Sequence, residues 1–113
     1  MTTHNRPYLR GKTIIGSLPS HAQRYYLTWD GGKDPKLKEF TETMCEKVEF
    51  HEILAQHGVT VFIHPDWHIG FEGTPEPDTI EYGNLIKAVW DNFKAEMSEF
   101  NLVVVDNWEG KVL

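Results

Sequence analysis

The sequence predicts a small α+β domain in which one antiparallel sheet carries two helices on one face, the split βαβ or ferredoxin-like plan. The chain has 113 residues, which is enough for one domain and short for two. Its composition, 40% hydrophobic and 12% aromatic, is typical of a globular chain rather than a disordered one. Strand-like and helix-like segments follow one another in the order β, α, β, β, α, β, which is the order of this fold class.

The first strand and the first helix come from residues 24 to 58. Arg24–Trp29 is rich in aromatic residues and is predicted to be a strand. Asp34 and Pro35 supply an N-cap and a proline at the first helical position, so we expect a helix over residues 35–57. Gly58 ends this helix in the manner of a capping glycine. Apolar residues recur along it at helical spacing: Leu37, Phe40, Met44, Val48, Ile53 and Leu54.

The rest of the chain carries further strand and helix signals. Val59–His64 is β-branched and is predicted to be a strand, and residues 67–73 form the next one. We expect a short extended piece at Thr79–Tyr82, after which Asn84 caps a second helix and Asn101 ends it. The remaining expected elements are that helix over Ile86–Phe100, strands at Leu102–Asp106 and Lys111–Leu113, and a short strand at Thr13–Ile15.

Charge is distributed unevenly along the chain. Its 17 acidic and 11 basic residues give a net charge of −6, with a net +1 on residues 1–64 and a net −7 on residues 65–113. We therefore divide the chain into a basic, extended N-terminal arm over residues 1–22 and one α+β domain over residues 23–113. An acidic balance argues against nucleic acid as a partner. The acidic balance is compatible with a cationic small ligand, with a basic protein partner, or with an acidic decoy surface.

The sequence predicts no membrane contact and a cytoplasmic location. No apolar run approaches the roughly 18 residues that a membrane helix needs, and no basic segment followed by an apolar one indicates a signal peptide. The single Cys45 rules out an intramolecular disulfide and fits a reducing compartment. Because the sequence offers Cys45 no basic partner, we expect it to pack rather than react.

His64, Asp66 and His68 are residue types that bind metals. Pro65 opposes an unbroken strand, which is what would place all three on one face. We therefore expect surface histidines beside a bend, with no metal site and no cofactor. The Gly-Lys-Thr triplet at residues 11–13 lacks the earlier glycine of a phosphate-binding loop, so we do not expect nucleotide binding there.

The segment from His68 to Thr79 is the most informative for function. It places glycines, an aromatic residue, prolines and carboxylates between two predicted elements. Gly70 and Gly73 allow close approach to the backbone. Prolines on both sides of Glu76 stiffen the loop, so that its carboxylate suits a cationic or hydroxyl-bearing ligand. An ordinary connection with solubilising acids is the alternative.

In order along the chain, Gly70, Phe71, Gly73 and Glu76 are followed by a helix and a Leu-Val-Val strand. This pattern resembles the phage-encoded S-adenosylmethionine lyases, the SAMase type. The element order over residues 24–113 is also similar to the small α/β sandwich of that family. The family pattern has a tyrosine where this chain has Phe71.

The resemblance implies a homotrimer in the host cytoplasm with substrate sites between subunits. It also implies cleavage of S-adenosylmethionine into methylthioadenosine and homoserine lactone, without a cofactor. In that reaction the substrate's own carboxylate attacks its γ-carbon and the C–S bond breaks to release a neutral thioether, so the enzyme need only fold the substrate and exclude solvent. The resemblance implies catalytic Glu76, with Gly70, Phe71 and Gly73 in substrate binding. From their positions alone, we add for substrate binding Asp78 in the same loop, Asp30 and Asp106 at the ends of the first and last predicted strands, and Trp67 or Trp29 stacking on adenine.

Two other functions fit the sequence. The acidic half, residues 65–113, suits a non-enzymatic inhibitor or interaction protein whose partner is basic. A phenylalanine instead of a tyrosine at position 71 suits a ferredoxin-like domain that binds a small ligand without turning it over. Production of methylthioadenosine would separate the enzyme from both.

Overall fold

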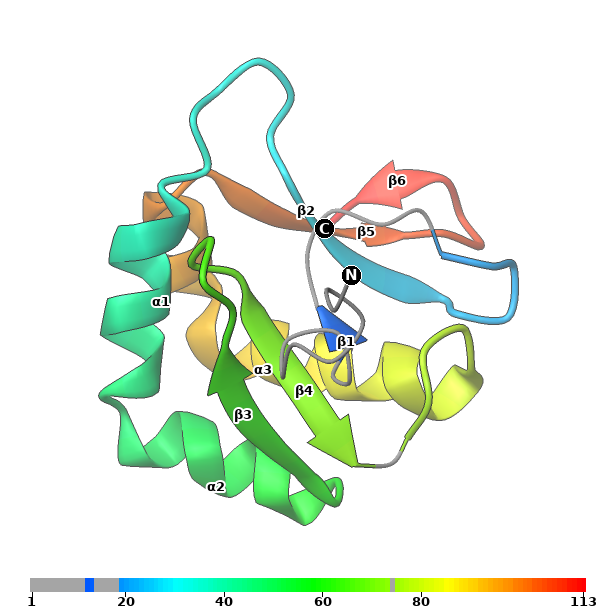
Figure 1. Ribbon diagram of the computed structural model, residues 1–113. Coiled ribbons are helices and arrows are strands. Elements are labelled where there is room, and N and C mark those ends of the chain that lie inside the picture. The colour runs from blue at the N-terminus through cyan, green and yellow to red at the C-terminus, as the bar shows by residue number, and fades with distance from the viewer. Residues whose placement is uncertain (1–11, 14–18, 74) are drawn as a thin grey trace, which may run out of the picture.

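The computed structural model describes residues 12–13, 19–73 and 75–113. The chain is α+β with antiparallel strands, compatible with a small ferredoxin-like fold, and this confirms the predicted class (Figure 1). The elements are β1 (Lys12–Thr13), β2 (Tyr25–Trp29), α1 (Leu37–Cys45), α2 (Val48–Gln56), β3 (Val59–Ile63), β4 (Ile69–Gly73), α3 (Ile80–Glu99), β5 (Leu102–Asp106) and β6 (Lys111–Val112). Of the strand expected at Thr13–Ile15, Thr13 lies in β1 and the other two residues lie outside the described ones, as does most of the predicted arm.

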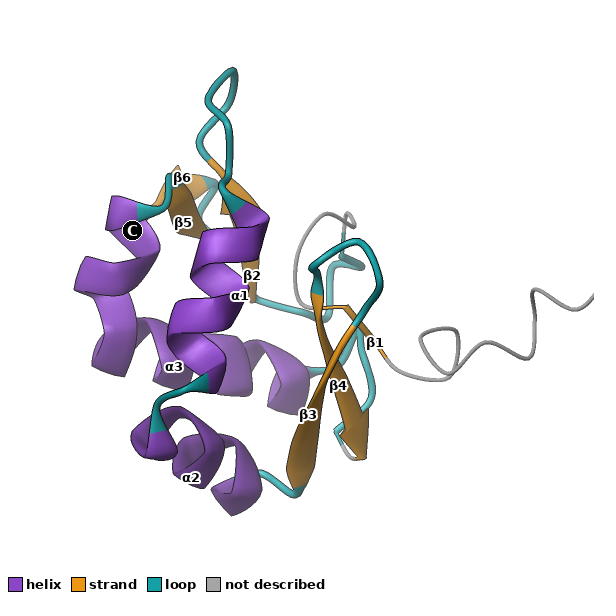
Figure 2. Ribbon diagram, turned by 60° about the vertical axis from the view of Figure 1, so that its left-hand side comes forward, coloured by secondary structure: helices purple, strands orange, loops and turns teal. Residues whose placement is uncertain are grey.

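The strands form two three-stranded sheets rather than the single sheet that we expected. Their orders are β1-β4-β3 and β2-β5-β6, and Figure 2 shows the two groups of strands in different parts of the molecule. In a closed ferredoxin-like sheet β2 would pair with β4. Here that edge of β4 pairs with β1 instead, through Lys12 with Phe71 and Thr13 with Gly70. A short N-terminal strand thus occupies this edge of β4, and β2 pairs with β5 in the other sheet.

The strand predictions hold for the main body of the chain. β2 and β5 pair antiparallel along their whole length, from Tyr25 with Asp106 to Trp29 with Leu102. β3 and β4 form a hairpin, and β6 pairs back onto β5 as expected, with Val112 opposite Val105. β2, β3 and β5 are rich in β-branched or aromatic residues, which favour the pleated conformation.

The helix expected over residues 35–57 is two helices, so that prediction was wrong. Lys47 has an extended backbone (φ −89°, ψ 120°) and separates α1 from α2. A continuous helix would place Phe50 about 120° round the axis from Met44, whereas both side chains are fully buried. The break brings both of them into the core and leaves Val48, a predicted core residue, 67% exposed. It also makes Cys45 a half-buried packing residue, as expected.

The second long helix begins earlier than we expected. Asn84 is not its cap, and of the expected extended piece Thr79–Tyr82 only Thr79 is extended (φ −123°, ψ 163°). Thr79 is the N-cap of α3, and its Oγ1 accepts a hydrogen bond from Tyr82 N at 3.2 Å. Tyr82 is 2% exposed and extends the apolar stripe by one turn. Asn101, with a left-handed backbone (φ 65°), follows the helix at its end as predicted.

Among the described residues, one hydrophobic core joins both sheets with α1, α2 and α3. α3 packs on β2 and β5, while α2 packs on β3 and on α3. At Gly83 a Cβ atom would lie 3.1 Å from the backbone nitrogens of Arg24 and Tyr25, so a glycine lets α3 approach β2 closely. None of the helices among the described residues is long and apolar enough to cross a membrane.

Candidate functional site

A cavity of about 470 Å³ lies where the end of α2 meets the loop between β4 and α3. Its volume is within the range of small-molecule sites in proteins. Three segments contribute to its wall: the end of α2, the β4–α3 loop and the first turn of α3. The lining residues are Gln56, His57, Pro75, Glu76, Thr79 and Glu81.

The loop that carries Glu76 is held by its own residues. The hydroxyl of Thr79 donates a hydrogen bond to the carbonyl oxygen of Glu76 at 2.6 Å while it accepts one from Tyr82 N. One side chain thus caps α3 and fixes the loop against it. Pro75 and Pro77 limit the backbone on either side of Glu76. The predicted stiffness of this loop therefore has two separate causes.

The electrostatic character of the cavity favours a cation. Glu76 and Glu81 bring two acidic side chains to its wall from the loop and from the first turn of α3. His57 is the C-cap of α2, so the carbonyl end of that helix, which carries partial negative charge, also lies at the wall. This combination suits a positively charged group or the hydroxyls of a sugar.

Of the predicted site residues, Glu76 lines this cavity and the others do not. Phe71 is 1% exposed and its ring centroid lies 6.1 Å from that of Tyr82, in the hydrophobic core. Burial raises the pKa of the Tyr82 phenol well above its usual value. Position 71 therefore contributes to packing beneath the loop rather than to the cavity wall.

The two predicted glycines are required by contacts within the protein. At Gly70 a Cβ atom would lie 2.6 Å from the ring of Phe62 and 2.6 Å from Nε2 of His64. At Gly73, where φ is +123°, a Cβ atom would lie 2.4 Å from the carbonyl oxygen of Gly58. We expected a substrate to come close to the backbone at Gly70 and Gly73, but the atoms that do so belong to Phe62, His64 and Gly58.

Trp67 and Asp30 lie away from the cavity. Trp67 precedes β4 and Glu76 follows it, so the strand, roughly 16 Å long, separates them. Trp67 has a left-handed backbone (φ 70°), and its carbonyl oxygen accepts a hydrogen bond from Thr41 Oγ1 at 2.5 Å. Asp30 follows the far end of β2, where its carboxylate pairs with Lys33 Nζ at 3.2 Å.

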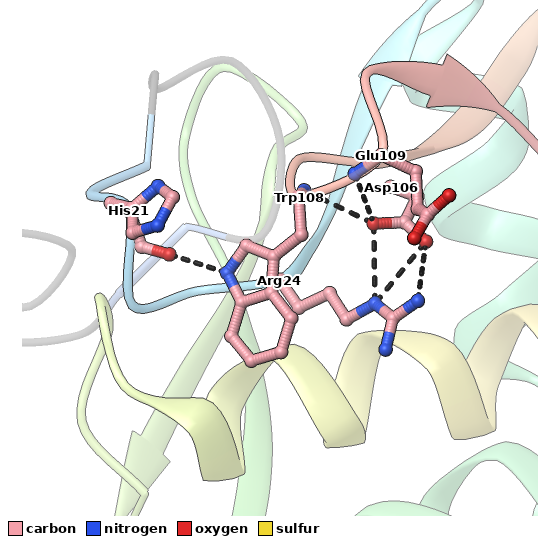
Figure 3. Close-up of polar contacts among 5 residues, drawn as sticks. All are labelled: His21, Arg24, Asp106, Trp108 and Glu109. Atoms are coloured by element: carbon pink, nitrogen blue, oxygen red, sulfur yellow. Dashed lines mark hydrogen bonds and ion pairs between the residues drawn. The ribbon is translucent and has the colours of Figure 1, made fainter.

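Asp106 is engaged in a structural ion pair (Figure 3). It is 2% exposed and accepts hydrogen bonds from Arg24 Nε at 3.2 Å and Nη2 at 2.9 Å. The backbone nitrogens of Trp108 and Glu109 donate to its Oδ1 at 3.1 Å. The Arg24 guanidinium holds the pKa of this carboxyl below its usual value. Trp108 Nε1 in turn donates to the carbonyl oxygen of His21 at 2.6 Å, which ties the turn to the segment before β2.

Asp78 is also held by the segment before β2. Its Oδ1 accepts a hydrogen bond from Ser20 N at 2.8 Å, and its carbonyl oxygen accepts one from Ser20 Oγ at 3.3 Å. Its backbone is left-handed (φ 64°). Asp78 and Asp106 thus lie at the same end of the molecule, where each has a fold-stabilising role.

Within the described residues, no group of three or more His, Cys, Asp or Glu side chains could hold a metal ion. His68 Nδ1 pairs with Asp66 Oδ2 at 2.9 Å. His64 is 8% exposed, not on the surface as we expected, and lies against Phe62 with ring centroids 4.9 Å apart. Burial lowers the pKa of this imidazole.

Sequence reasoning missed most of the cavity wall. Gln56 and His57 come from the end of a helix whose position relative to the β4–α3 loop is set by the β3–β4 hairpin. Glu81 was placed in an extended piece, and a correct N-cap at Thr79 would have put it in the first turn of α3.

Comparisons with known proteins return no relative: no family model matches this chain, and neither a curated protein nor a solved structure matches it. The function is therefore argued from the cavity and from the resemblance noted in the sequence.

Proposed function

We propose that the cavity beside Glu76 binds S-adenosylmethionine and that the protein cleaves it to methylthioadenosine and homoserine lactone. The observation that carries this proposal is that Glu76, the acidic residue picked out by the family resemblance, lines a cavity of about 470 Å³ together with Glu81. The sulfonium and ammonium groups of the substrate are cations, and two exposed carboxylates at the wall of an open pocket would attract them.

The chemistry asks little of the protein. The substrate carboxylate forms the new C–O bond at its own γ-carbon, and the electrons of the breaking C–S bond stay on sulfur. Glu76 holds the substrate ammonium or a ribose hydroxyl. This contact keeps the methionine part of the substrate folded, so that its carboxylate can reach the γ-carbon. Glu81 adds negative charge where the substrate carries positive charge.

The test is incubation of the purified protein with S-adenosylmethionine and chromatography of methylthioadenosine. Hydrogen bonds to charged groups are worth about 1.5–3 kcal/mol, so Glu76→Gln should lower kcat/KM about 10- to 100-fold. Glu72→Gln is the matched control, because Glu72 is an exposed carboxylate on β4 that does not line the cavity. No product and no binding by the unaltered protein would end the proposal, and equal activity of both variants would remove Glu76 from it.

We further propose that the active form is a homotrimer, as the family resemblance implies. Trp67 and Asp30 lie away from Glu76 within one chain, so any part they take in the same site would come from a neighbouring subunit. Sedimentation equilibrium tests this directly. A monomer at concentrations where the protein is active would contradict it.

Binding without turnover is the second candidate, and Phe71 is the observation that favours it. The family pattern has a phenol at this position, whereas Phe71 is buried and carries no hydroxyl. Calorimetric binding of S-adenosylmethionine with no product would establish a ligand-binding domain. Salt-sensitive binding to a basic protein, with no affinity for S-adenosylmethionine, would instead support the interaction protein.

A further inference from the structure

Gln23 is a buried polar residue that the sequence did not single out. It lies just before β2 and is 6% exposed. Both ends of its side-chain amide are used: Nε2 donates to the carbonyl oxygen of Tyr25 at 3.0 Å, and Oε1 accepts from Asp78 N at 3.1 Å. A buried amide that makes both hydrogen bonds connects its two partners specifically, because losing either hydrogen bond would leave a buried polar group unsatisfied and cost free energy.

The two partners of Gln23 belong to different parts of the fold. Tyr25 is in the sheet β2-β5-β6, and Asp78 is in the loop between β4 and α3 that carries Glu76. The carbonyl of Tyr25 can only accept and the N–H of Asp78 can only donate, so the bridging side chain must both donate and accept. Glutamine has this property, whereas a carboxylate or an apolar side chain does not.

We propose that Gln23 is a positioning residue of the cavity: it fixes Asp78 and so holds the loop that presents Glu76. Ser20 supports the same point, since its backbone and hydroxyl bond to Asp78. Thr79 fixes the loop from the α3 side. The inference rests on the proposed function for its effect on turnover, while the positioning itself is a property of the ligand-free protein.

The first experiment measures amide hydrogen exchange of the ligand-free protein. After correction for any change in global stability, Gln23→Leu should speed amide hydrogen exchange at Asp78 at least tenfold. Val104→Ala is the control, because Val104 is a fully buried residue of β5 whose truncation destabilises the core without touching the loop. Equal exchange at Asp78 in both variants, after correction for global stability, would overturn the proposal.

Gln23→Glu keeps the interpretation open to test if the leucine variant does not fold. A carboxylate accepts from Asp78 N but cannot donate to Tyr25, whereas the protonated acid does both. The ionised carboxylate would also face the carbonyl oxygen of Tyr25 with no donor between them, and this repulsion should displace it from Asp78 N. Protection of Asp78 in Gln23→Glu, compared with the unaltered protein at each pH, should therefore rise as the pH falls below the pKa of the new acid. A protection factor that does not depend on pH would contradict the bridging role.

A second measurement, kcat/KM for S-adenosylmethionine, tests whether the position of the loop affects the site. Gln23→Leu should lower kcat/KM at least fivefold, and Val104→Ala should leave it unchanged at a temperature where both are folded. Faster exchange at Asp78 with unchanged kcat/KM would overturn the positioning of Glu76. If the unaltered protein makes no product, the proposed function has failed, and the exchange experiment alone decides the role of Gln23.

Discussion

The ring of Phe62 lies directly against Gly70 on the neighbouring strand, so that a Cβ atom at position 70 would be 2.6 Å from Phe62 Cζ. Nε2 of the His64 imidazole would also lie 2.6 Å from that Cβ atom. Neither contact is with the end of a long, flexible side chain, so relief requires movement of an aromatic ring. The glycine is thus explained by packing between β3 and β4.

Gly70→Ala should destabilise the protein by about 1–3 kcal/mol, the usual cost of overpacking. Urea unfolding followed by tryptophan fluorescence measures it. Gly31→Ala is the control, since a Cβ atom there meets nothing within 4 Å, and it should be close to neutral. If the two variants unfold at the same urea concentration, Phe62 and His64 adapt freely and Gly70 needs another explanation.

The local signals predicted most elements, because they depend on neighbours in the chain. Alternation and β-branching located β2, β3 and β5, and Asn101 correctly ended α3. The break at Lys47 was not predictable from the stripe alone, since Val48 fits a continuous helix better than Phe50 does. Burial of Phe50 against the rest of the core decided the outcome.

The candidate site was predictable only in its central residue. Glu76 stood out because two prolines flank it, which is a local feature. His57 reaches the same cavity through the path of α2 and the hairpin, and Gln23 reaches the loop from 55 residues away. Nothing in the sequence distinguishes such residues from ordinary surface residues, because their partners are set by tertiary structure.

Acid should weaken the protein through the Arg24–Asp106 pair. The hydrogen bond and charge of Arg24 hold the pKa of Asp106 below its ordinary 3.8. The stabilisation is therefore complete at neutral pH and is lost as the pH falls through about 4 towards the lowered value. Asp106→Asn should lower the urea midpoint at pH 7, with a difference from the unaltered protein that shrinks below pH 4. Asp91→Asn removes an exposed carboxylate paired with Lys87 and should change little; an equal loss in both would place the effect in overall charge.

A second acid effect should come from His64 at higher pH. Burial lowers the pKa of its imidazole. The charge of Asp66 raises this pKa and that of His68 lowers it, and burial has the largest effect. The unfolded chain then binds a proton more readily than the folded one, so stability is full above about pH 6.5 and decreases as the pH falls below it. Urea midpoints between pH 8 and 5 should show this slope, and His64→Gln should flatten it. His21→Gln, at an exposed imidazole, should keep it; a slope that survives in His64→Gln would assign it elsewhere.

The start of α3 gives a direct comparison between the residue that the sequence favoured as a cap and the one that the structure uses. Thr79 Oγ1 accepts from Tyr82 N and donates to the carbonyl oxygen of Glu76. Thr79→Ala should therefore cost about 1 kcal/mol in urea unfolding and loosen the loop. Asn84 is exposed inside the helix, where alanine has the better helix propensity, so Asn84→Ala should be neutral or slightly stabilising. The reverse ranking would mean that the helix begins at Asn84, and that residues 79–82 do not hold Glu76 at the cavity.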